Sequence, residues 1–125
     1  MKKILVVDDE QDVQILFQQR FRREIRDNEF EFVFALSGHD ALHYMDNHNK
    51  EGVLILSDIN MPGMSGLELL KHIKQKYESL APIVMMITAY GDTGNYNDAM
   101  QLGADDFLTK PLDFSLLKEK LKNVS

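Results

Sequence analysis

The sequence predicts an α/β domain in which helices cover both faces of a doubly wound, five-stranded parallel sheet. Short aliphatic runs alternate with amphipathic segments along the chain, which is the order that parallel strands and their crossover helices require. The run at residues 53–56 has no polar alternation, as is typical of a strand buried on both faces. The chain has 125 residues, the usual size of one domain, so we expect residues 1–125 to form one unit.

The first half of the chain contains three of the expected strands. Residues 3–7 form a short aliphatic run, and residues 13–25 then repeat apolar side chains at helical spacing, which predicts one amphipathic helix of about four turns. Residues 29–36 alternate aromatic and more polar side chains, which indicates a strand with one wetter face. Ser37 is a candidate N-cap for the next helix, after which the central strand runs to Asp58.

The second half repeats the alternation of strand and helix. Ser65 is placed to cap a helix with an apolar stripe, and residues 82–88 form another buried run. The polar, glycine-containing stretch that follows predicts a short and weakly held helix at about residues 93–102. A last short strand at residues 105–110 precedes a helix that Asp113 can cap.

The order of the strands places several functional side chains on one rim. The wetter second strand belongs at an edge, which together with right-handed crossovers predicts the flavodoxin-like order 2-1-3-4-5. Strands one and three are then neighbours, so Asp8 and Asp9 would face Asp58 across the crevice at the switch point. Thr88 and Lys110 end the fourth and fifth strands on the same rim.

These side chains point to a metal site that handles phosphate. Three neighbouring carboxylates need a cation to stay ionised, and oxygen ligands without His or Cys favour Mg²⁺ or a similar divalent ion such as Mn²⁺. Lys110 and Thr88 would supply the charge and the hydrogen bond that a phosphoryl group needs. Asp58 is left as the nucleophile, and its attack on phosphorus would give an aspartyl phosphate.

With these residues placed, the chain resembles the receiver domains of two-component response regulators over nearly its whole length. Four segments carry the resemblance in the family's order and approximate spacing: residues 6–10, 57–66, 88–89 and 108–111. The resemblance implies that Asp58 takes a phosphoryl group from the phosphohistidine of a sensor histidine kinase or a histidine phosphotransfer protein. It also implies that Mg²⁺ is bound by Asp9, Asp58 and the Asn60 carbonyl, with Asp8 helping through water.

Further roles follow from the same resemblance. It implies that Thr88 and Phe107 are the switch pair, and that the peptide bond between Lys110 and Pro111 is cis. Phe107 departs from the family, which often has Tyr there, and a Phe offers no hydroxyl to a partner. Asn60 and Tyr90 stand at the positions that flank the path of the hydrolytic water. The family's chemistry is confined to its own acceptor, so we do not expect an enzyme that acts on an external substrate.

The expected output surface combines the segment 89–102, strand 105–110 and the last helix. Phosphorylation adds charge beside Thr88 and Lys110 and should bias the weakly held segment nearby. Leu116 is a candidate exposed apolar contact on this face. Its partner would be a downstream protein, a fused output domain or a second copy in a phosphorylation-dependent homodimer. The sequence leaves open whether the receiver is free-standing or part of a longer regulator.

The composition limits the kinds of partner that we expect for this chain. The net charge of -6 gives no basic footprint for nucleic acid or acidic lipid, and the local cluster of four arginines at residues 20–26 is interpreted as a solvated helix face. No segment approaches the length of a membrane span. The chain has no cysteine, which removes disulfides and thiolate chemistry and fits a reducing compartment, so we expect the cytoplasm.

Other interpretations stay open at this stage. The aspartates could simply cap turns and helices. His39 and His43 have the i, i+4 spacing of a zinc-binding helix, but Asp40 stands where the general-base Glu belongs. Flavin binding is disfavoured because an acidic loop would repel phosphate. A haloacid-dehalogenase-like phosphatase needs a second Asp where this chain has Asn60, which cannot act as a general acid.

Overall fold

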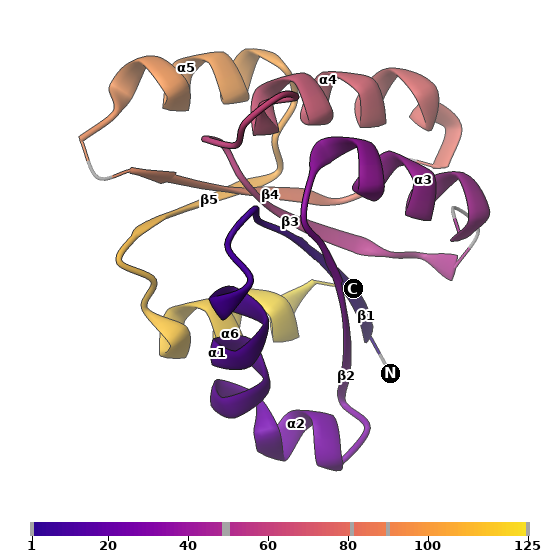
Figure 1. The fold of residues 1–125 in the computed structure, drawn as a ribbon, viewed down its shortest axis with the longest axis vertical. Helices are drawn as coiled ribbons and strands as arrows, with labels where there is room; N and C mark the ends of the chain where they lie inside the picture. The colour runs from indigo at the N-terminus through magenta and orange to yellow at the C-terminus, as the bar shows by residue number, and fades with distance from the viewer. Residues whose placement is uncertain (1, 49–50, 81, 90, 125) are drawn as a thin grey trace.

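The computed structural model describes residues 2–48, 51–80, 82–89 and 91–124, which build one open sheet with helices packed on both faces (Figure 1). In chain order its elements are β1 (Lys2–Val7), α1 (Asp12–Arg20), α2 (Arg22–Arg26), β2 (Phe30–Ala35), α3 (Gly38–His48), β3 (Leu54–Asp58), α4 (Gly66–Lys76), the 3₁₀ helix η2 (Glu78–Leu80), β4 (Val84–Ala89), α5 (Thr93–Gln101), β5 (Asp106–Lys110) and α6 (Phe114–Asn123). None of the described helices is both long and apolar enough to cross a bilayer.

The five strands are all parallel and lie in the order β2-β1-β3-β4-β5, so the predicted topology is confirmed. The register brings the strand ends level, because Val7 pairs with Ser57, Asp58 with Ile87, and Ala89 with Lys110. The residues at the carboxyl ends of β1, β3, β4 and β5 therefore share one rim of the sheet.

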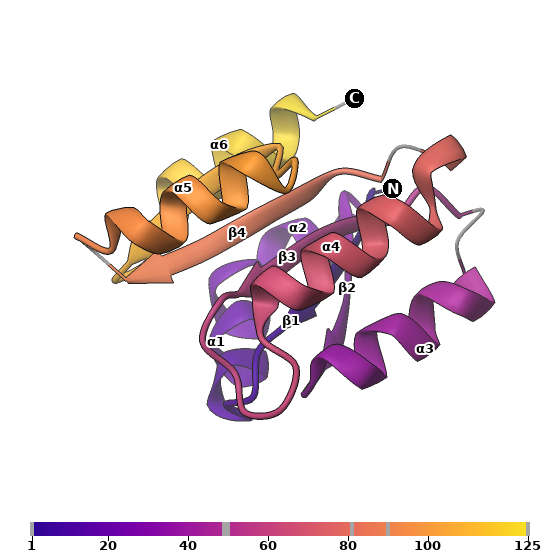
Figure 2. The same cartoon turned by 90° about the horizontal axis from the view of Figure 1, so that it is seen from above.

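Two layers of helices explain why the central strands are aliphatic throughout. Helices α3, α4 and α5 cover one face, and α1, α2 and α6 cover the other (Figures 1 and 2). In β3 the fully buried Ile55 belongs to the core under the first layer. Its neighbours Leu54 and Leu56 belong to the core under the second. Alternate residues thus enter different cores, which explains why β3 is apolar on both faces until Ser57 and Asp58 at its carboxyl end.

The second strand is the predicted edge, and its three phenylalanines face the layer of α1 and α6. Phe17 of α1 is fully buried at the centre of this aromatic group, with ring centroids 5.6 Å from Phe32, 6.2 Å from Phe34 and 5.5 Å from Phe114. These rings fix one face of the edge strand, while Val33 and Ala35 pack against the core on the other face.

The helix predicted for residues 13–25 is wrong in one respect, because it is two helices. The backbone leaves helical geometry at Phe21, with φ -110° and ψ 23°, between α1 and α2. This break lets the fully buried Phe21 enter the aromatic core and turns Glu24 inward, where only 4% of the residue is exposed. Glu24 Oε2 lies 3.0 Å from Lys118 Nζ on α6, while the four arginines around it stay exposed.

Local capping follows the sequence closely. Ser65 accepts a hydrogen bond from the Glu68 backbone N–H, and Asp113 accepts from the first turn of α6, as predicted. Ser37 accepts from the backbone N–H of Asp40 at the start of α3. Asp92, to which the sequence analysis gave no role, caps α5 by accepting from Asn95. These side chains fix where the helices begin.

The Glu24–Lys118 pair allows a stability prediction. Lys118→Met should lower the free energy of unfolding at neutral pH by about 1–3 kcal/mol, because it leaves a buried carboxylate without its cation. Burial is the largest single effect and raises the pKa of Glu24, but the hydrogen bond and charge of Lys118, a backbone hydrogen bond and the charge of Lys122 together outweigh it and lower the pKa on balance. A lowered pKa in the folded state means that the stabilisation is present above the unfolded pKa and is lost as pH falls through the folded one. Urea unfolding at neutral and acidic pH should therefore show a difference between the two proteins that shrinks below about pH 4.5.

Lys122→Met is the matched control for this measurement, because the charge of Lys122 is the smallest of these effects on the pKa of Glu24 and its own partner is Glu29. Lys122 Nζ lies 3.7 Å from Glu29 Oε2 in a pair whose side chains are both nearly half exposed. Such a pair contributes only about 0–1 kcal/mol. Equal destabilisation by the two substitutions would show that the buried Glu24–Lys118 pair contributes no more to stability than the exposed Glu29–Lys122 pair.

Candidate functional site

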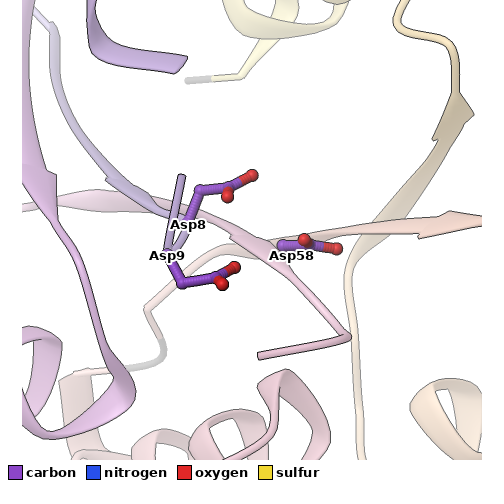
Figure 3. A group of neighbouring side chains, drawn as sticks. All are labelled: Asp8, Asp9 and Asp58. Atoms are coloured by element: carbon purple, nitrogen blue, oxygen red, sulfur yellow. The ribbon is translucent and has the colours of Figure 1, made fainter. Parts of the chain in front are cut away.

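Three carboxylates converge where β1 and β3 end side by side. Asp8 and Asp9 follow β1, Asp58 is the last residue of β3, and Figure 3 shows the three side chains directed toward a common space. One oxygen from each lies within 4.8 Å of the others. Asp8 and Asp58 are 7% and 3% exposed, whereas Asp9 is open to solvent. A cation could thus enter from the side of Asp9.

Asp8 is the carboxyl group whose ionisation the site opposes. Burial, and then the neighbouring charge of Asp58, raise the pKa of Asp8 above its ordinary value. The Glu10 backbone N–H donates to Asp8 Oδ1 at 2.9 Å and acts in the opposite direction, as does Lys110. Asp8 does therefore fix the loop after β1, but it does not cap α1, which has no side-chain cap.

Lys110 supplies the cationic group on the same rim. Its Nζ lies 2.9 Å from Asp58 Oδ2, and 44% of its side chain is exposed. Partial burial lowers the pKa of Lys110, but the hydrogen bond to Asp58 and the charges of Asp58 and Asp8 outweigh that effect and raise it. The Lys110–Pro111 peptide bond is cis. The ammonium group thus stays charged beside the Asp58 carboxylate.

The other predicted site residues lie around this cluster. Thr88 is buried at the end of β4, and its hydroxyl donates to the Ala89 carbonyl at 3.2 Å. Phe107 of β5 is half-buried, with its ring centroid 4.5 Å from that of Tyr96 on α5. Asn60 lies in the exposed loop after β3. Tyr90 lies outside the described residues.

Gly66 packs against the end of β3 at Asp58, and the sequence did not predict this role. Its backbone N–H donates to the Ile59 carbonyl at 2.8 Å, which closes the loop that follows Asp58. A Cβ at this position would lie 2.1 Å from the Asp58 carbonyl oxygen and 2.7 Å from the Ile59 Cα. The glycine after the N-cap Ser65 was visible in the sequence, but the close approach of two backbone segments was not.

We expect Gly66→Ala to destabilise the fold and displace Asp58. The new methyl group meets backbone on two sides, so the end of β3 has to move, at a cost of about 1–3 kcal/mol. Gly94→Ala in α5 is the matched control, because the nearest heavy atom to its Cβ would be 3.8 Å away. That substitution should stabilise by about 0.5–1 kcal/mol. Urea unfolding followed by circular dichroism measures both, and a neutral Gly66→Ala would contradict the close approach.

The donor set fits a hard divalent cation. Within the ranges that the structure describes, Asp8, Asp9 and Asp58 are the one group of acidic or histidine side chains close enough to share an ion. His39 and His43 on α3 are exposed and outside that group, so the zinc alternative gains no support. Oxygen-only ligands at the mouth of a crevice suit Mg²⁺, which keeps several water ligands.

Comparison with known proteins agrees with this site. The family model described as the response regulator receiver domain matches residues 4–122. Sporulation initiation phosphotransferase F of Bacillus subtilis is 32% identical over 121 residues, which cover 97% of this chain and 91% of that protein. A chemotaxis protein CheY homolog of Campylobacter jejuni is 32% identical over 98% of this chain and 91% of its own length. Response regulator RppA of Synechocystis is also 32% identical over 96% of this chain, but the match spans 49% of that protein.

Solved structures show the same architecture. Chemotaxis protein CheY4 of Vibrio cholerae superposes with a TM-score of 0.83 at 26% identity, covering 100% of this chain and 99% of that one. A response regulator receiver domain protein from Clostridium thermocellum gives a TM-score of 0.84 at 27% identity, covering 98% and 93%. Sequence, fold and acidic cluster lead to one conclusion: the chain belongs to the response regulator receiver domain family.

Proposed function

We propose that this chain is a signalling receiver that accepts a phosphoryl group on Asp58 from the phosphohistidine of a sensor histidine kinase or a histidine phosphotransfer protein. One observation carries the proposal: Asp58 is 3% exposed, lies 2.9 Å from Lys110 Nζ, and shares a cluster with Asp8 and Asp9. A buried carboxylate between a cation and a metal-binding pair is suited to nucleophilic attack on phosphorus. Incubation with Mg²⁺ and acetyl phosphate, followed by mass spectrometry of peptides, should locate one phosphoryl group on Asp58.

The family provides the general frame. Receiver domains act in phosphorylation-dependent signalling, bind Mg²⁺ in an acidic pocket, and interact with histidine kinases or phosphotransfer proteins and with output domains. They are not enzymes in the usual sense. For this chain we propose that residues 1–125 form one such unit, in the cytoplasm, either alone or joined to an output domain.

Asp8, Asp9, Asp58 and the Asn60 carbonyl are the proposed metal-binding groups. A bound Mg²⁺ would neutralise the carboxylates and the phosphoryl oxygens. Asp9 is the most accessible of the carboxylates, while buried Asp8 has the raised pKa and the backbone hydrogen bond to Glu10. We propose that Asp8 acts at longer range, through water, because its carboxylate is already held by the loop.

The proposed phosphoryl transfer depends on three side chains, those of Asp58, Lys110 and Thr88. A carboxylate oxygen of Asp58 forms the new bond to phosphorus, while the P–N bond to the donor imidazole breaks and its electron pair returns to the ring nitrogen. Lys110 holds its proton throughout and pairs with a phosphoryl oxygen. Thr88 would exchange its present bond to the Ala89 carbonyl for a bond to the phosphoryl group. This exchange makes Thr88 a sensor of the modified state.

Asn60 and Tyr90 are the proposed determinants of how long the phosphoryl group persists. The Asn60 side chain is an amide and cannot act as a general acid, so we do not expect this protein to hydrolyse external phosphate esters rapidly. The role of Tyr90 rests on its place in the sequence, two residues after Thr88. Both residues are proposed to act on the hydrolytic water.

The proposed output surface combines α5, β5 and α6. Phe107 of β5 packs on Tyr96 of α5, which links the strand beside Thr88 to an exposed helix. Tyr96, Met100 and Leu116 expose 43, 51 and 44% of their surfaces on these elements. Large apolar side chains left in solvent favour a contact with a partner or a second copy.

Hydrogen exchange should report this switch. Of the α5 residues, Ala99 alone is buried, so the helix is held weakly, and movement of Thr88 and Phe107 should change its opening. We expect phosphorylation by acetyl phosphate to slow amide exchange in α5 and β5 by several-fold. Asp58→Asn treated in the same way is the control. A change confined to α1 would contradict the assigned surface.

A further inference from the structure

The arginines of this chain are confined to one short segment. All four lie at positions 20, 22, 23 and 26, and the remaining side chains carry twenty acidic groups against ten lysines. All four arginines are exposed, on the last turn of α1 and on α2. A compact basic patch thus stands on an otherwise acidic molecule, and arginine is the cation best suited to bidentate pairing with carboxylates.

The patch borders an apolar groove. This groove has a volume of about 630 Å³ and lies between α1–α2 and the edge strand β2. Its lining residues are Gln18, Arg22, Ile25, Arg26, Asn28, Phe30, Glu31, Phe32 and Phe34. A second hollow of about 440 Å³ is lined by all four arginines together with Gln19, Glu24 and Lys118. Arg22 and Arg26 line both, so they form the ridge between an aromatic floor and a basic pocket.

The edge of β2 adds backbone hydrogen-bonding groups to this groove. β2 pairs with β1 on one side and is the outermost strand of the sheet. The carbonyls of Glu29 and Ala35 accept hydrogen bonds from β1, so the odd-numbered residues face β1 in the parallel ladder. The N–H and C=O groups of the three phenylalanines, at even-numbered positions, are therefore directed outward. The strand contains neither proline nor lysine to block pairing.

We propose that this face is a docking site for an acidic protein segment that adds to β2 as an extra strand. Its backbone pairs with the outward groups of β2, and alternate apolar side chains cover Phe32 and Phe34, which are half-buried. Its carboxylates pair with Arg22 and Arg26. The contact between Arg26 and Asp27 is 3.3 Å long, with side chains 69 and 51% exposed, so an incoming carboxylate replaces it at little cost.

The distribution of charge favours an acidic protein segment over a second copy of the chain, a nucleic acid or a membrane as the occupant of this face. Antiparallel pairing of β2 with a second copy sets the two arginine clusters at opposite ends of the paired strands, so they do not meet. Two copies that each carry a net charge of -6 nevertheless repel one another, which opposes such a dimer. Nucleic acids and anionic membranes extend beyond the patch and meet the acidic remainder of the molecule. A short acidic segment is small enough to stay within the groove, where Arg22 and Arg26 outnumber Glu31, and the aromatic floor favours a segment that also carries apolar residues.

The site is separate from the acidic cluster. β2 starts beside α2 and runs away from it (Figure 1). Its far end lies at the rim of the cluster, where the Asp8 backbone N–H donates to the Ala35 carbonyl. The arginines therefore lie near the opposite end of the strand. Binding at this edge does not require Asp58, and the proposed phosphorylation can fail without affecting it.

Selection from a random-peptide display library on the whole chain tests the proposal. We expect the selected peptides to carry their Asp or Glu and their aliphatic or aromatic residues at every second position, because Arg22, Arg26 and the phenylalanines line the same groove on one face of the strand. They should bind about tenfold more weakly to the Arg22→Ser/Arg26→Ser double variant. The amides of Phe30, Phe32 and Phe34 should become protected from exchange when a selected peptide binds. Lys71→Ser/Lys76→Ser on α4 removes the same charge from the opposite face and should bind normally, as should Asp58→Asn.

Several results would overturn the proposal. These are a selection that yields no acidic and apolar peptides, binding that survives the arginine substitutions, or equal loss in the α4 control. Self-association in sedimentation experiments that the arginine substitutions abolish would assign the edge to a second copy. Binding of oligothymidylate or phosphatidylserine vesicles that depends on Arg22 and Arg26, without peptide binding, would assign it to nucleic acid or membrane.

Discussion

Asp58→Asn is expected to abolish phosphorylation of this protein by acetyl phosphate in Mg²⁺. The carboxylate of Asp58 is the only one in the cluster that combines burial with an ion pair to Lys110, at 2.9 Å. An amide of the same shape keeps the packing but is a poor nucleophile and loses the negative charge that holds Lys110. Intact-mass spectrometry should show one phosphoryl group on the wild type, labile to hydroxylamine, and none on the variant.

Asp98→Asn is the matched control, since Asp98 is an exposed carboxylate on α5 outside the cluster. It should be phosphorylated like the wild type. A hydroxylamine-labile adduct that persists in Asp58→Asn would move the acceptor to Asp8 or Asp9, the other carboxylates of the cluster.

The fold and the composition of the cluster follow from local patterns in the sequence. Aliphatic runs that end on acid at Asp8 and Asp58 indicate both the strands and what stands at their ends. Because parallel strands end on a common rim, the pattern alone brings Asp8, Asp9, Asp58 and Lys110 together. The alternation in residues 29–36 likewise predicts the edge position of β2, since only an edge strand keeps a wetter face.

What the sequence did not predict depends on contacts between distant segments. The helical period of residues 13–25 continues through Phe21, but the backbone leaves helical geometry at this residue, whose ring is fully buried in the aromatic core. In the sequence Glu24 is an acidic residue among arginines. Only the structure shows that its partner is Lys118, which is far away along the chain. Gly66 likewise shows its importance only where the loop meets the Asp58 carbonyl. The sequence pattern indicated only a solvated helix face for the arginine segment. The groove beside it forms when β2 packs next to α1 and α2, which the pattern of the helix alone does not show.

Mg²⁺ is expected to raise the melting temperature of the wild type strongly. An ion that binds the folded site but hardly the unfolded chain stabilises by about 2.7 kcal/mol at one hundred times its Kd, which is roughly 10 °C for a domain of this size. The stabilisation comes from the close approach of three carboxylates, within 4.8 Å of one another, two of them buried. Differential scanning calorimetry in chelator and in Mg²⁺ measures the shift.

The same cluster predicts that Asp58→Asn melts higher than the wild type in chelator. The substitution removes the repulsion of Asp58 with Asp8 and Asp9, and the charge of Asp58 contributes to the raised pKa of Asp8. It also removes the ion pair with Lys110, but the ammonium group left behind is on a side chain that is 44% exposed and remains solvated by water. Repulsion from two carboxylates therefore outweighs the lost attraction, and Asp9→Asn, at an exposed position, should gain less.

Both variants should gain little from added Mg²⁺, whereas Asp98→Asn should gain as much as the wild type. If the aspartates were only caps, the order in chelator would reverse, because the loss of a charged cap costs stability. A wild type that does not respond to Mg²⁺, together with a destabilised Asp58→Asn, would therefore contradict a metal site between β1 and β3. A wild type that responds while Asp58→Asn responds equally would instead leave the metal to Asp8 and Asp9 and remove Asp58 from its ligands.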